Sequence, residues 1–219
     1  MDLLIFDLDG TLIDSKLDLA VAVNATRAHM GLAPLDNDRV ESYVGDGAPV
    51  LMRRALGPEA SDAEVQRALE FFLAYYRDHK LDHTTLYPGV ADTLDRLRDR
   101  GLKMAVLTNK PVRISQAILD GLGVGGHFFQ VYGGGSFEQK KPDPAGVEKL
   151  LAEAGVAREE ALMVGDSAVD VRTARNAGIR CCGVTYGFQP ESLVMEAPDI
   201  LIDRFEELAG LELLRKERK

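Results

Sequence analysis

Short apolar runs alternate with segments of helical periodicity through most of the chain. This alternation is typical of a parallel sheet whose two faces are covered by helices. Strands buried on both faces should be short and almost wholly apolar. Six runs meet that description, and we expect strands at 3–6, 103–107, 128–132, 161–165, 181–185 and 199–202. The pattern predicts an α/β fold.

Helices with readable ends separate these strands. Pro88 begins one that Gly101 ends, and Pro111 begins another that reaches about Leu122. Further helices are expected near 144–154, 168–177 and 204–215. The glycine-rich run at 121–126 follows a helix and precedes a strand, which is the reverse of a dinucleotide-binding turn, so we interpret it as a loop.

One interval breaks the alternation, because no strand is expected from residue 15 to about residue 85. Helical spacing runs from Leu17 to a stop at Gly31, and Ser61 with Glu64 forms a capping box that begins a second long helix. Roughly 70 residues of helices therefore follow the first strand, a size suited to a small lid over the ligand edge of the sheet. The expected division is an α/β core at 1–14 and 86–219 and a helical cap at 15–85.

Polar side chains stand where the expected strands end, and the ligand crevice of an open parallel sheet lies beyond those ends. The residues concerned are Asp7 and Asp9 after the first strand, Thr108, Asn109 and Lys110 after the second, Lys141 beyond the third, and Asp166 after the fourth, with Asp170 four residues on. We expect three of these carboxylates (Asp7, Asp9 and Asp166), the Thr108 hydroxyl and the Lys141 ammonium group to converge there.

This set of groups favours phosphoryl transfer. Asp7, Asp9 and Asp166 would repel one another unless a hard cation lay among them, and Mg²⁺ prefers oxygen ligands. One carboxylate can attack phosphorus, and a second, two residues on, can protonate the leaving oxygen and then activate water. Lys141 and Thr108 are suited to holding the phosphoryl oxygens.

Four sequence segments carry a resemblance to a known family. They are FDLDGTLIDS, VLTNK, KKPDP and VGDSAVDVRTARNAG, and they span Ile5 to Gly178. In this order they resemble the four motifs of the haloacid dehalogenase-like superfamily. The resemblance implies a Rossmann-like parallel sheet core with an inserted all-helical cap domain of the C1 type.

The resemblance also implies a role for each matching residue. It makes Asp7 the nucleophile that forms an aspartyl-phosphate, and Asp9 the general acid and base. It implies Mg²⁺ bound by the Asp7 side chain, the Asp9 backbone carbonyl and Asp166. Thr108 and Asn109 would bind phosphate, Lys141 would balance charge, and Asp170 would be an outer or alternative metal partner.

Within this family the run VGDGAPVLMRRALG at 44–57 is similar to the cap segment of bacterial phosphoglycolate phosphatases. A substrate as small as 2-phosphoglycolate needs a donor for its carboxylate. We expect that donor from the loop before a helix beginning near Ala48, whose positive end favours anions, with Arg54 as a further candidate. Arg53 is expected to be solvated.

Other functions remain open on the sequence. The substrate could be pyrophosphate, a sugar phosphate or a nucleotide, and the same scaffold supports sugar phosphomutases. A phospho-receiver signalling module shares the parallel sheet with strand-end acids and a lysine. The long cap counts against the receiver, because a signalling switch needs no lid.

Charge limits the partners further. The chain has 26 Lys+Arg against 35 Asp+Glu, a formal net charge of −9, which argues against binding a nucleic acid duplex or a membrane surface. It has no apolar run of about 18 residues and no signal-peptide pattern. We therefore expect a cytoplasmic monomer or homodimer whose partner is a small phosphorylated metabolite.

Overall fold

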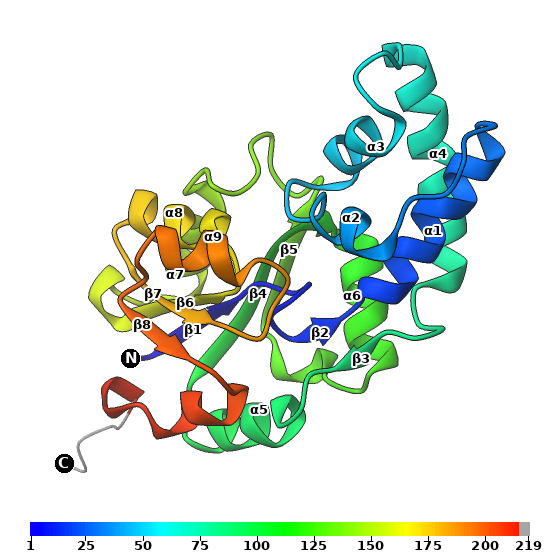
Figure 1. Ribbon diagram of the computed structural model, residues 1–219. Coiled ribbons are helices and arrows are strands. Elements are labelled where there is room, and N and C mark those ends of the chain that lie inside the picture. Colours follow the sequence, from blue (N-terminus) through cyan, green and yellow to red (C-terminus); the bar gives the residue numbers. More distant parts are fainter. Residues whose placement is uncertain (215–219) are drawn as a thin grey trace.

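The computed structural model describes residues 1–214 and has a six-stranded parallel sheet at its centre (Figure 1). The strands in chain order are β1 (Leu3–Phe6), β4 (Lys103–Pro111), β5 (Gln130–Gly134), β6 (Ala161–Gly165), β7 (Arg180–Val184) and β8 (Ile200–Ile202). They lie in the order β5-β4-β1-β6-β7-β8, so the chain runs outward from β1 to β5 and then returns to the opposite side of β1. This reversal places a ligand crevice between the ends of β1 and β6.

Successive strand residues point to opposite faces of the sheet, and each face is covered by helices. Leu4 and Phe6 pack on the side of α5 (Val90–Asp99) and α6 (Val112–Gly121). Leu3 and Ile5 pack on the other side, which is covered by α7 (Ala145–Ala154), α8 (Ala168–Ala177) and α9 (Pro190–Met195). All four of these β1 side chains are fully buried. The predicted α/β class with a helix-covered parallel sheet is confirmed.

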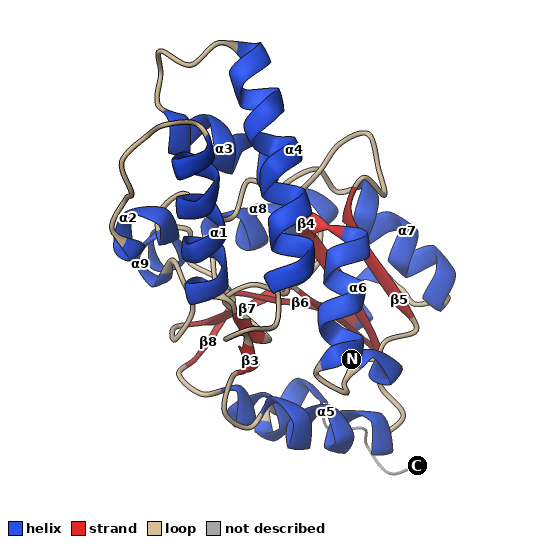
Figure 2. Ribbon diagram, turned by 90° about the vertical axis from the view of Figure 1, so that its right-hand side faces the viewer, coloured by secondary structure: helices blue, strands red, loops and turns tan. Residues whose placement is uncertain are grey.

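The segment between the first two core strands is helical, as expected (Figure 2). It contains α1 (Lys16–His29), α2 (Asn37–Glu41), α3 (Ala48–Leu56) and α4 (Asp62–His79). Val23, Met52 and Phe72 form part of its buried interior. The predicted capping box is present at the start of α4, where the Glu64 N–H donates to Ser61 Oγ and the Ser61 N–H donates to the Glu64 carboxylate.

Two short strands that were not predicted join the ends of this helical segment. They are β2 (Ile13–Asp14) and β3 (Thr85–Leu86), which pair antiparallel. The buried Asp18 carboxylate strengthens the junction by accepting hydrogen bonds from the N–H groups of His83 (3.0 Å) and Thr84 (2.8 Å). The two segments that connect the helical insert to the sheet are therefore held side by side.

The prediction of one continuous helix at 204–215 was wrong. The structure has two 3₁₀ helices there, η3 (Phe205–Gly210) and η4 (Glu212–Leu214), and residue 215 lies outside the described part of the chain. Phe205, Leu208, Leu211 and Leu214 recur every three residues and pack on the core, which suits the three residues per turn of a 3₁₀ helix.

The remaining differences are small. β5 begins two residues later than expected, β4 continues to Pro111, and α9 was not predicted. Single 3₁₀ turns lie at η1 (Gly125–His127), within the expected loop region, and at η2 (Arg158–Glu160). None of the helices formed between residues 1 and 214 has the length and apolar character that crossing a bilayer requires.

Candidate active site

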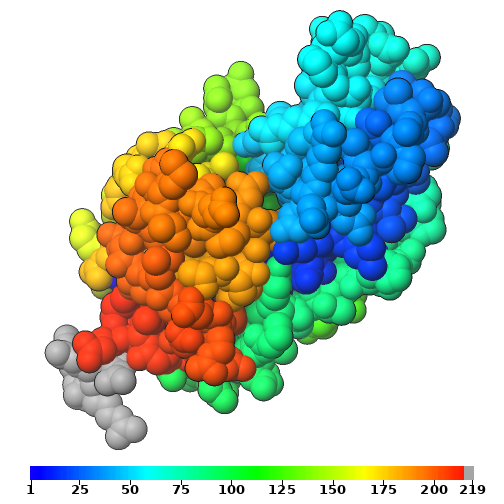
Figure 3. All heavy atoms as spheres, viewed as in Figure 1, coloured from blue at the N-terminus to red at the C-terminus, as the bar shows by residue number. Residues whose placement is uncertain are grey.

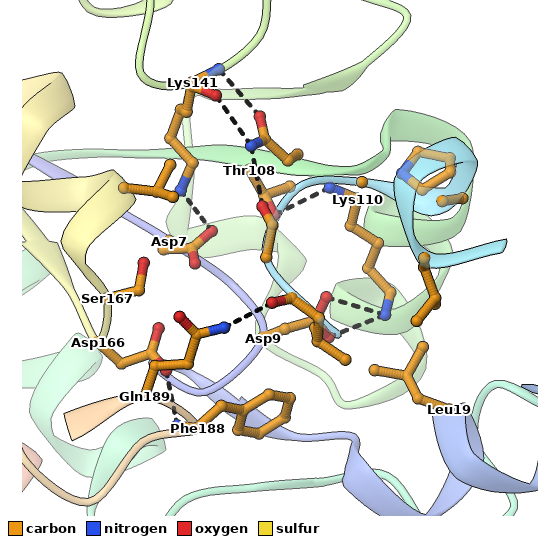
Figure 4. A pocket seen from close by; sticks show the side chains of 18 of the residues that line it. Asp7, Asp9, Leu19, Thr108, Lys110, Lys141, Asp166, Ser167, Phe188 and Gln189 are labelled. Carbon is orange, nitrogen blue, oxygen red and sulfur yellow. Dashed lines mark hydrogen bonds and ion pairs between the residues drawn. The ribbon is translucent and has the colours of Figure 1, made fainter. Parts of the chain in front are cut away.

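A pocket lies at the carboxyl end of the sheet, between the core and the helical segment (Figure 4). It encloses about 670 Å³, part of it open to solvent. Six of the residues predicted for the site line it: Asp7, Asp9, Thr108, Asn109, Lys141 and Asp166. Side chains of α1, α3 and α4 form its opposite wall. Figure 3 shows the blue and cyan surface of the helical segment against the orange surface of the segment after β7.

Three buried carboxylates form a close group in this region. Asp7, Asp166 and Asp170 each offer an oxygen atom, and these atoms lie within 4.8 Å of one another. Asp7 follows β1 and Asp166 follows the neighbouring β6, so the sheet order brings them together. Glycines allow the close approach, because a Cβ atom on Gly10 or Gly187 would lie 2.2 Å from an Asp166 side-chain atom.

Burial and mutual repulsion disfavour the ionised state of these acids. Burial raises the pKa of Asp7 to about 6, with Lys141 opposing the rise and Asp170 adding to it. Burial also raises the pKa of Asp166 well above its usual range, and the charges of Asp170 and Asp7 raise it further. A group of oxygen donors with excess negative charge is suited to a hard divalent cation. These acids therefore fit a Mg²⁺ site.

Lys141 is the cation that faces this group. Its Nζ lies 2.8 Å from Asp7 Oδ1 and 2.6 Å from Asp170 Oδ1. Asp170 is held in turn, because its Oδ2 accepts hydrogen bonds from the Ser167 N–H (3.1 Å) and hydroxyl (2.8 Å). Burial lowers the pKa of Lys141, but the charges of Asp170 and Asp7 outweigh burial and raise it above its usual value. The side chain therefore stays an ammonium group.

The position of the Asp9 side chain corrects the expected convergence. Its carboxylate does not belong to the close group of three acids. It lies instead against Lys110, whose Nζ is 2.8 and 3.1 Å from its two oxygens, and it accepts a hydrogen bond from Ser15 Oγ at 2.5 Å. The buried ammonium of Lys110, which also contacts Tyr76 of α4, holds the carboxylate on that side of the pocket. The metal contact expected of Asp9 through its backbone carbonyl stays a prediction.

Lys110 and Tyr76 are pocket residues to which the sequence assigned no role. Lys110 Nζ donates to Tyr76 Oη at 2.7 Å and lies 4.5 Å from the centre of its ring. Tyr76 is 1% exposed. Lys110 stands in the expected strand-end cluster, but Tyr76 lies on the apolar stripe of α4, where periodicity indicates only packing.

Asn109 connects the core with the helical segment. Its Nδ2 donates to the carbonyls of Gly45 (3.0 Å) and Lys141 (3.1 Å), and its Oδ1 accepts from the Lys141 N–H (2.9 Å). The side-chain amide therefore positions Lys141 and the loop before α3, so the phosphate-binding role expected of Asn109 is not visible in its side-chain contacts. Thr108 Oγ1 accepts a hydrogen bond from the Lys110 N–H at 3.3 Å, which leaves its hydroxyl hydrogen available to a ligand.

The structure places Arg54 away from the pocket lining, which corrects its expected role as a carboxylate donor. Its guanidinium binds the Tyr43 carbonyl at 3.0 Å and the Asp46 carboxylate at 2.6 Å. Tyr43 and Asp46 both precede α3, so these contacts hold the Arg54 side chain against the loop before that helix. Arg53 pairs with Asp62 at the outside of the helical segment. The loop itself and the first residue of α3 do line the pocket.

The fold is a Rossmann-like sheet with a helical insert after its first strand. Buried acids lie where the strand order reverses, and this combination is typical of one class of hydrolases. The chain belongs to the haloacid dehalogenase-like hydrolases, whose family pattern it matches over residues 4–184. A phosphoglycolate phosphatase of Pseudomonas putida is 44% identical over 208 residues, which cover 92% of this chain and 76% of that protein. Another from Chromobacterium violaceum is 41% identical over 210 residues, covering 94% of both chains.

Solved structures show the same relationship. A predicted phosphoglycolate phosphatase from Haemophilus somnus superposes with a TM-score of 0.91 at 33% identity, covering 96% of this chain and 97% of that one. CbbY from Rhodobacter sphaeroides, solved in complex with phosphate, gives a TM-score of 0.78 at 28% identity, covering 98% and 99%.

Proposed function

We propose that this protein is a Mg²⁺-dependent phosphatase that hydrolyses a small phosphomonoester, 2-phosphoglycolate, through an aspartyl-phosphate on Asp7. The observation that carries the reaction type is the group of buried acids faced by the Lys141 ammonium inside a covered pocket. The names of the relatives at 41–44% identity support the choice of substrate.

Asp7 and Asp166 would hold the metal, together with the backbone carbonyl of Asp9. When bound, Mg²⁺ supplies positive charge that binds the phosphoryl group and lowers the repulsion between the acids. Asp170 would act from outside the metal site, since both of its oxygens already accept hydrogen bonds from Lys141 and Ser167. Lys141 and the Thr108 hydroxyl would hold phosphoryl oxygens.

The proposed reaction has two steps. In the first, Asp9 is in its protonated form; a carboxylate oxygen of Asp7 forms a bond to phosphorus while the bond to the ester oxygen breaks, and Asp9 gives its proton to that leaving oxygen. In the second, Asp9 takes a proton from water, the water oxygen bonds to phosphorus, and the bond between phosphorus and Asp7 breaks. Inorganic phosphate and the free alcohol are released, and both carboxyl groups return to their initial state.

Residues 15–85 would act as the cap of this site and residues 1–14 and 86–219 as its core. Leu19, Leu51 and Phe72 give the cap side of the pocket an apolar wall. Such a wall excludes water while the phosphoryl group is transferred, which strengthens the electrostatic interactions inside. We further propose a cytoplasmic monomer or homodimer that acts on a free metabolite.

The test is a panel of phosphomonoesters measured with Mg²⁺ and with excess chelator. We expect turnover only with Mg²⁺ and the highest kcat/KM for 2-phosphoglycolate. A kcat/KM at least tenfold higher for a hexose phosphate or a nucleotide would reject the substrate but keep the phosphatase. Isomerisation of a sugar phosphate without phosphate release would indicate a mutase, and a stable phosphoprotein without turnover would indicate a receiver.

A further inference from the structure

The chemistry of a two-carbon phosphoester limits where its carboxylate can lie. The leaving oxygen must come within hydrogen-bond distance of Asp9 if Asp9 protonates it. In 2-phosphoglycolate the carboxyl carbon is only two bonds from that oxygen. The substrate carboxylate must therefore lie beside the groups that surround Asp9, and not on a distant part of the cap.

The cationic side chain at that place is Lys110. Among the residues that line the pocket, all of them in the described part of the chain, the cations are Lys110 and Lys141. Lys141 lies beside Asp7 and Asp170 and not beside Asp9, and Arg54 is turned away to Asp46. Lys110 Nζ lies 2.8 Å from Asp9, so a substrate carboxylate bound beside Asp9 would lie close to its positive charge.

Tyr76 offers a second donor next to Lys110. Its hydroxyl oxygen accepts the hydrogen bond from Lys110 Nζ, and no acceptor for its own hydrogen is found within residues 1–214. Burial raises the pKa of Tyr76 to about 12, with Lys110 opposing the rise and Asp9 adding to it, so the hydrogen is retained at neutral pH. The hydroxyl can turn toward the pocket that its residue lines.

We propose that the Lys110 ammonium and the Tyr76 hydroxyl form the subsite for the substrate carboxylate, and that they select small phosphorylated acids over neutral phosphoesters. This inference rests on the proposed function. Lys110 comes from the core strand β4 and Tyr76 from the cap helix α4, so the subsite exists only when the cap is seated on the core.

The surroundings strengthen this selection. Leu19, Leu51 and Phe72 line the same wall of the pocket and offer no hydrogen bonds from their side chains. An ion pair in such surroundings is less screened than one in water. The hydroxyl groups of a sugar phosphate would lie against apolar side chains there, and unpaired polar groups are costly to bury.

The experiment compares two substrates that share a phosphate and differ in one group, 2-phosphoglycolate and 2-hydroxyethyl phosphate. The quantity measured is the ratio of their kcat/KM values, which cancels any general loss of acid catalysis when Asp9 loses its partner. We expect Lys110→Met to lower the ratio by about 10- to 100-fold, the range for losing a hydrogen bond to a charged group. Tyr76→Phe, which keeps the packed ring, should lower it several-fold.

Matched control residues of the same types lie outside the pocket lining. Tyr75, the neighbour of Tyr76 on α4, stacks on Phe71 and His79 outside the pocket lining, so Tyr75→Phe should leave the ratio unchanged. Lys149 is an exposed lysine paired with Glu153, and Lys149→Met should also leave it unchanged.

The outcomes separate the two claims. A wild-type ratio near one means that the enzyme does not select the carboxylate, which rejects the proposed substrate. A high wild-type ratio that survives both Lys110→Met and Tyr76→Phe keeps the substrate and overturns the subsite. Equal loss on both substrates in Lys110→Met would show that Lys110 only positions Asp9, and would also overturn it.

Binding without turnover gives a second readout, in case Lys110→Met folds poorly. The probes are 3-phosphonopropanoate, in which a methylene group replaces the bridging oxygen, and propylphosphonate, which lacks the carboxylate. We expect Tyr76→Phe to weaken binding of the first probe several-fold in calorimetry and to leave the second unchanged. Unchanged affinity for both probes would contradict the subsite.

Discussion

Lys141 donates a 2.6 Å hydrogen bond to Asp170, and both side chains are almost fully buried, with 3% and 0% of their surfaces exposed. Asp170 is itself fixed by two hydrogen bonds from Ser167 at the start of α8. The ammonium group that faces Asp7 is therefore positioned by an acid in the first turn of α8. Asp170 acts on the chemistry through Lys141 and is a positioning residue.

Asp170→Asn should lower the free energy of unfolding by about 3 kcal/mol in saturating Mg²⁺, because it removes one partner of a buried ion pair. The measurement is urea denaturation. Asp99→Asn is the control, since Asp99 pairs with Arg98 at the surface and its loss should have no measurable effect. Equal midpoints for wild type and Asp170→Asn would show that the pair does not stabilise the fold.

Without metal, the protein should become less stable as the pH rises from about 4 to 6. The pKa of Asp7 is about 6 in the folded protein and near 3.8 when it is unperturbed, so over this range the folded state keeps a proton that the unfolded state has lost. Asp166, whose pKa is also raised, acts in the same direction. At 1.36 kcal/mol per pKa unit, the Asp7 contribution is about 3 kcal/mol.

The measurement for this effect is denaturation in chelator at several pH values, for wild type and Asp7→Asn. The difference between them isolates Asp7, and Asp7→Asn should gain stability relative to wild type toward pH 7. Mg²⁺ should then stabilise wild type more than the variant. Parallel pH profiles for the two proteins would contradict the proximity of these acids.

Asp9→Asn should affect substrates according to their leaving groups. We expect kcat/KM for 2-phosphoglycolate, which reports the first step and whose alkoxide is a poor leaving group, to fall by roughly 10²–10⁴, as is usual for losing a general acid. The loss for p-nitrophenyl phosphate should be much smaller, because its leaving group needs no proton. Equal losses on both substrates would mean that Asp9 is not the acid.

Arg54→Ala should leave the preference for 2-phosphoglycolate unchanged within about twofold, since Arg54 holds the loop and does not line the pocket. The half-exposed pair of Arg54 with Asp46 also contributes little stability. KM values for 2-phosphoglycolate and 2-hydroxyethyl phosphate give the comparison. A selective rise in KM for the acid alone would restore the role expected from the sequence.

The sequence predicts the core well where local and global signals agree. β1 and β6 are found at the expected residues because each is a short apolar run that ends at an acid of the site. The C-terminal segment was misjudged because periods of 3.0 and 3.6 are hard to distinguish over so few residues. Leu208 and Leu214 fit the shorter one.

The site was predictable as far as topology determines it. Asp7, Asp166 and Lys141 meet because parallel strands end at one edge of the sheet. The direction of the Asp9 side chain and its contact with Lys110 depend on side-chain conformation and on how the cap packs. Neither leaves a local pattern in the sequence, and a tyrosine on an apolar helix stripe looks like any other packed residue.

The most direct test of the central claim is to trap the phosphoenzyme. Wild type and Asp9→Asn are mixed with 2-phosphoglycolate labelled at phosphorus in the presence of Mg²⁺, quenched in acid within a turnover and mapped by mass spectrometry. Label should appear on the peptide that carries Asp7 in wild type and should be absent from Asp7→Asn. With labelled p-nitrophenyl phosphate, whose leaving group needs no proton, label should accumulate in Asp9→Asn because the second step lacks its base. Turnover by wild type with no labelled peptide in either protein, or label on another residue, would contradict the assignment of Asp7 as the nucleophile.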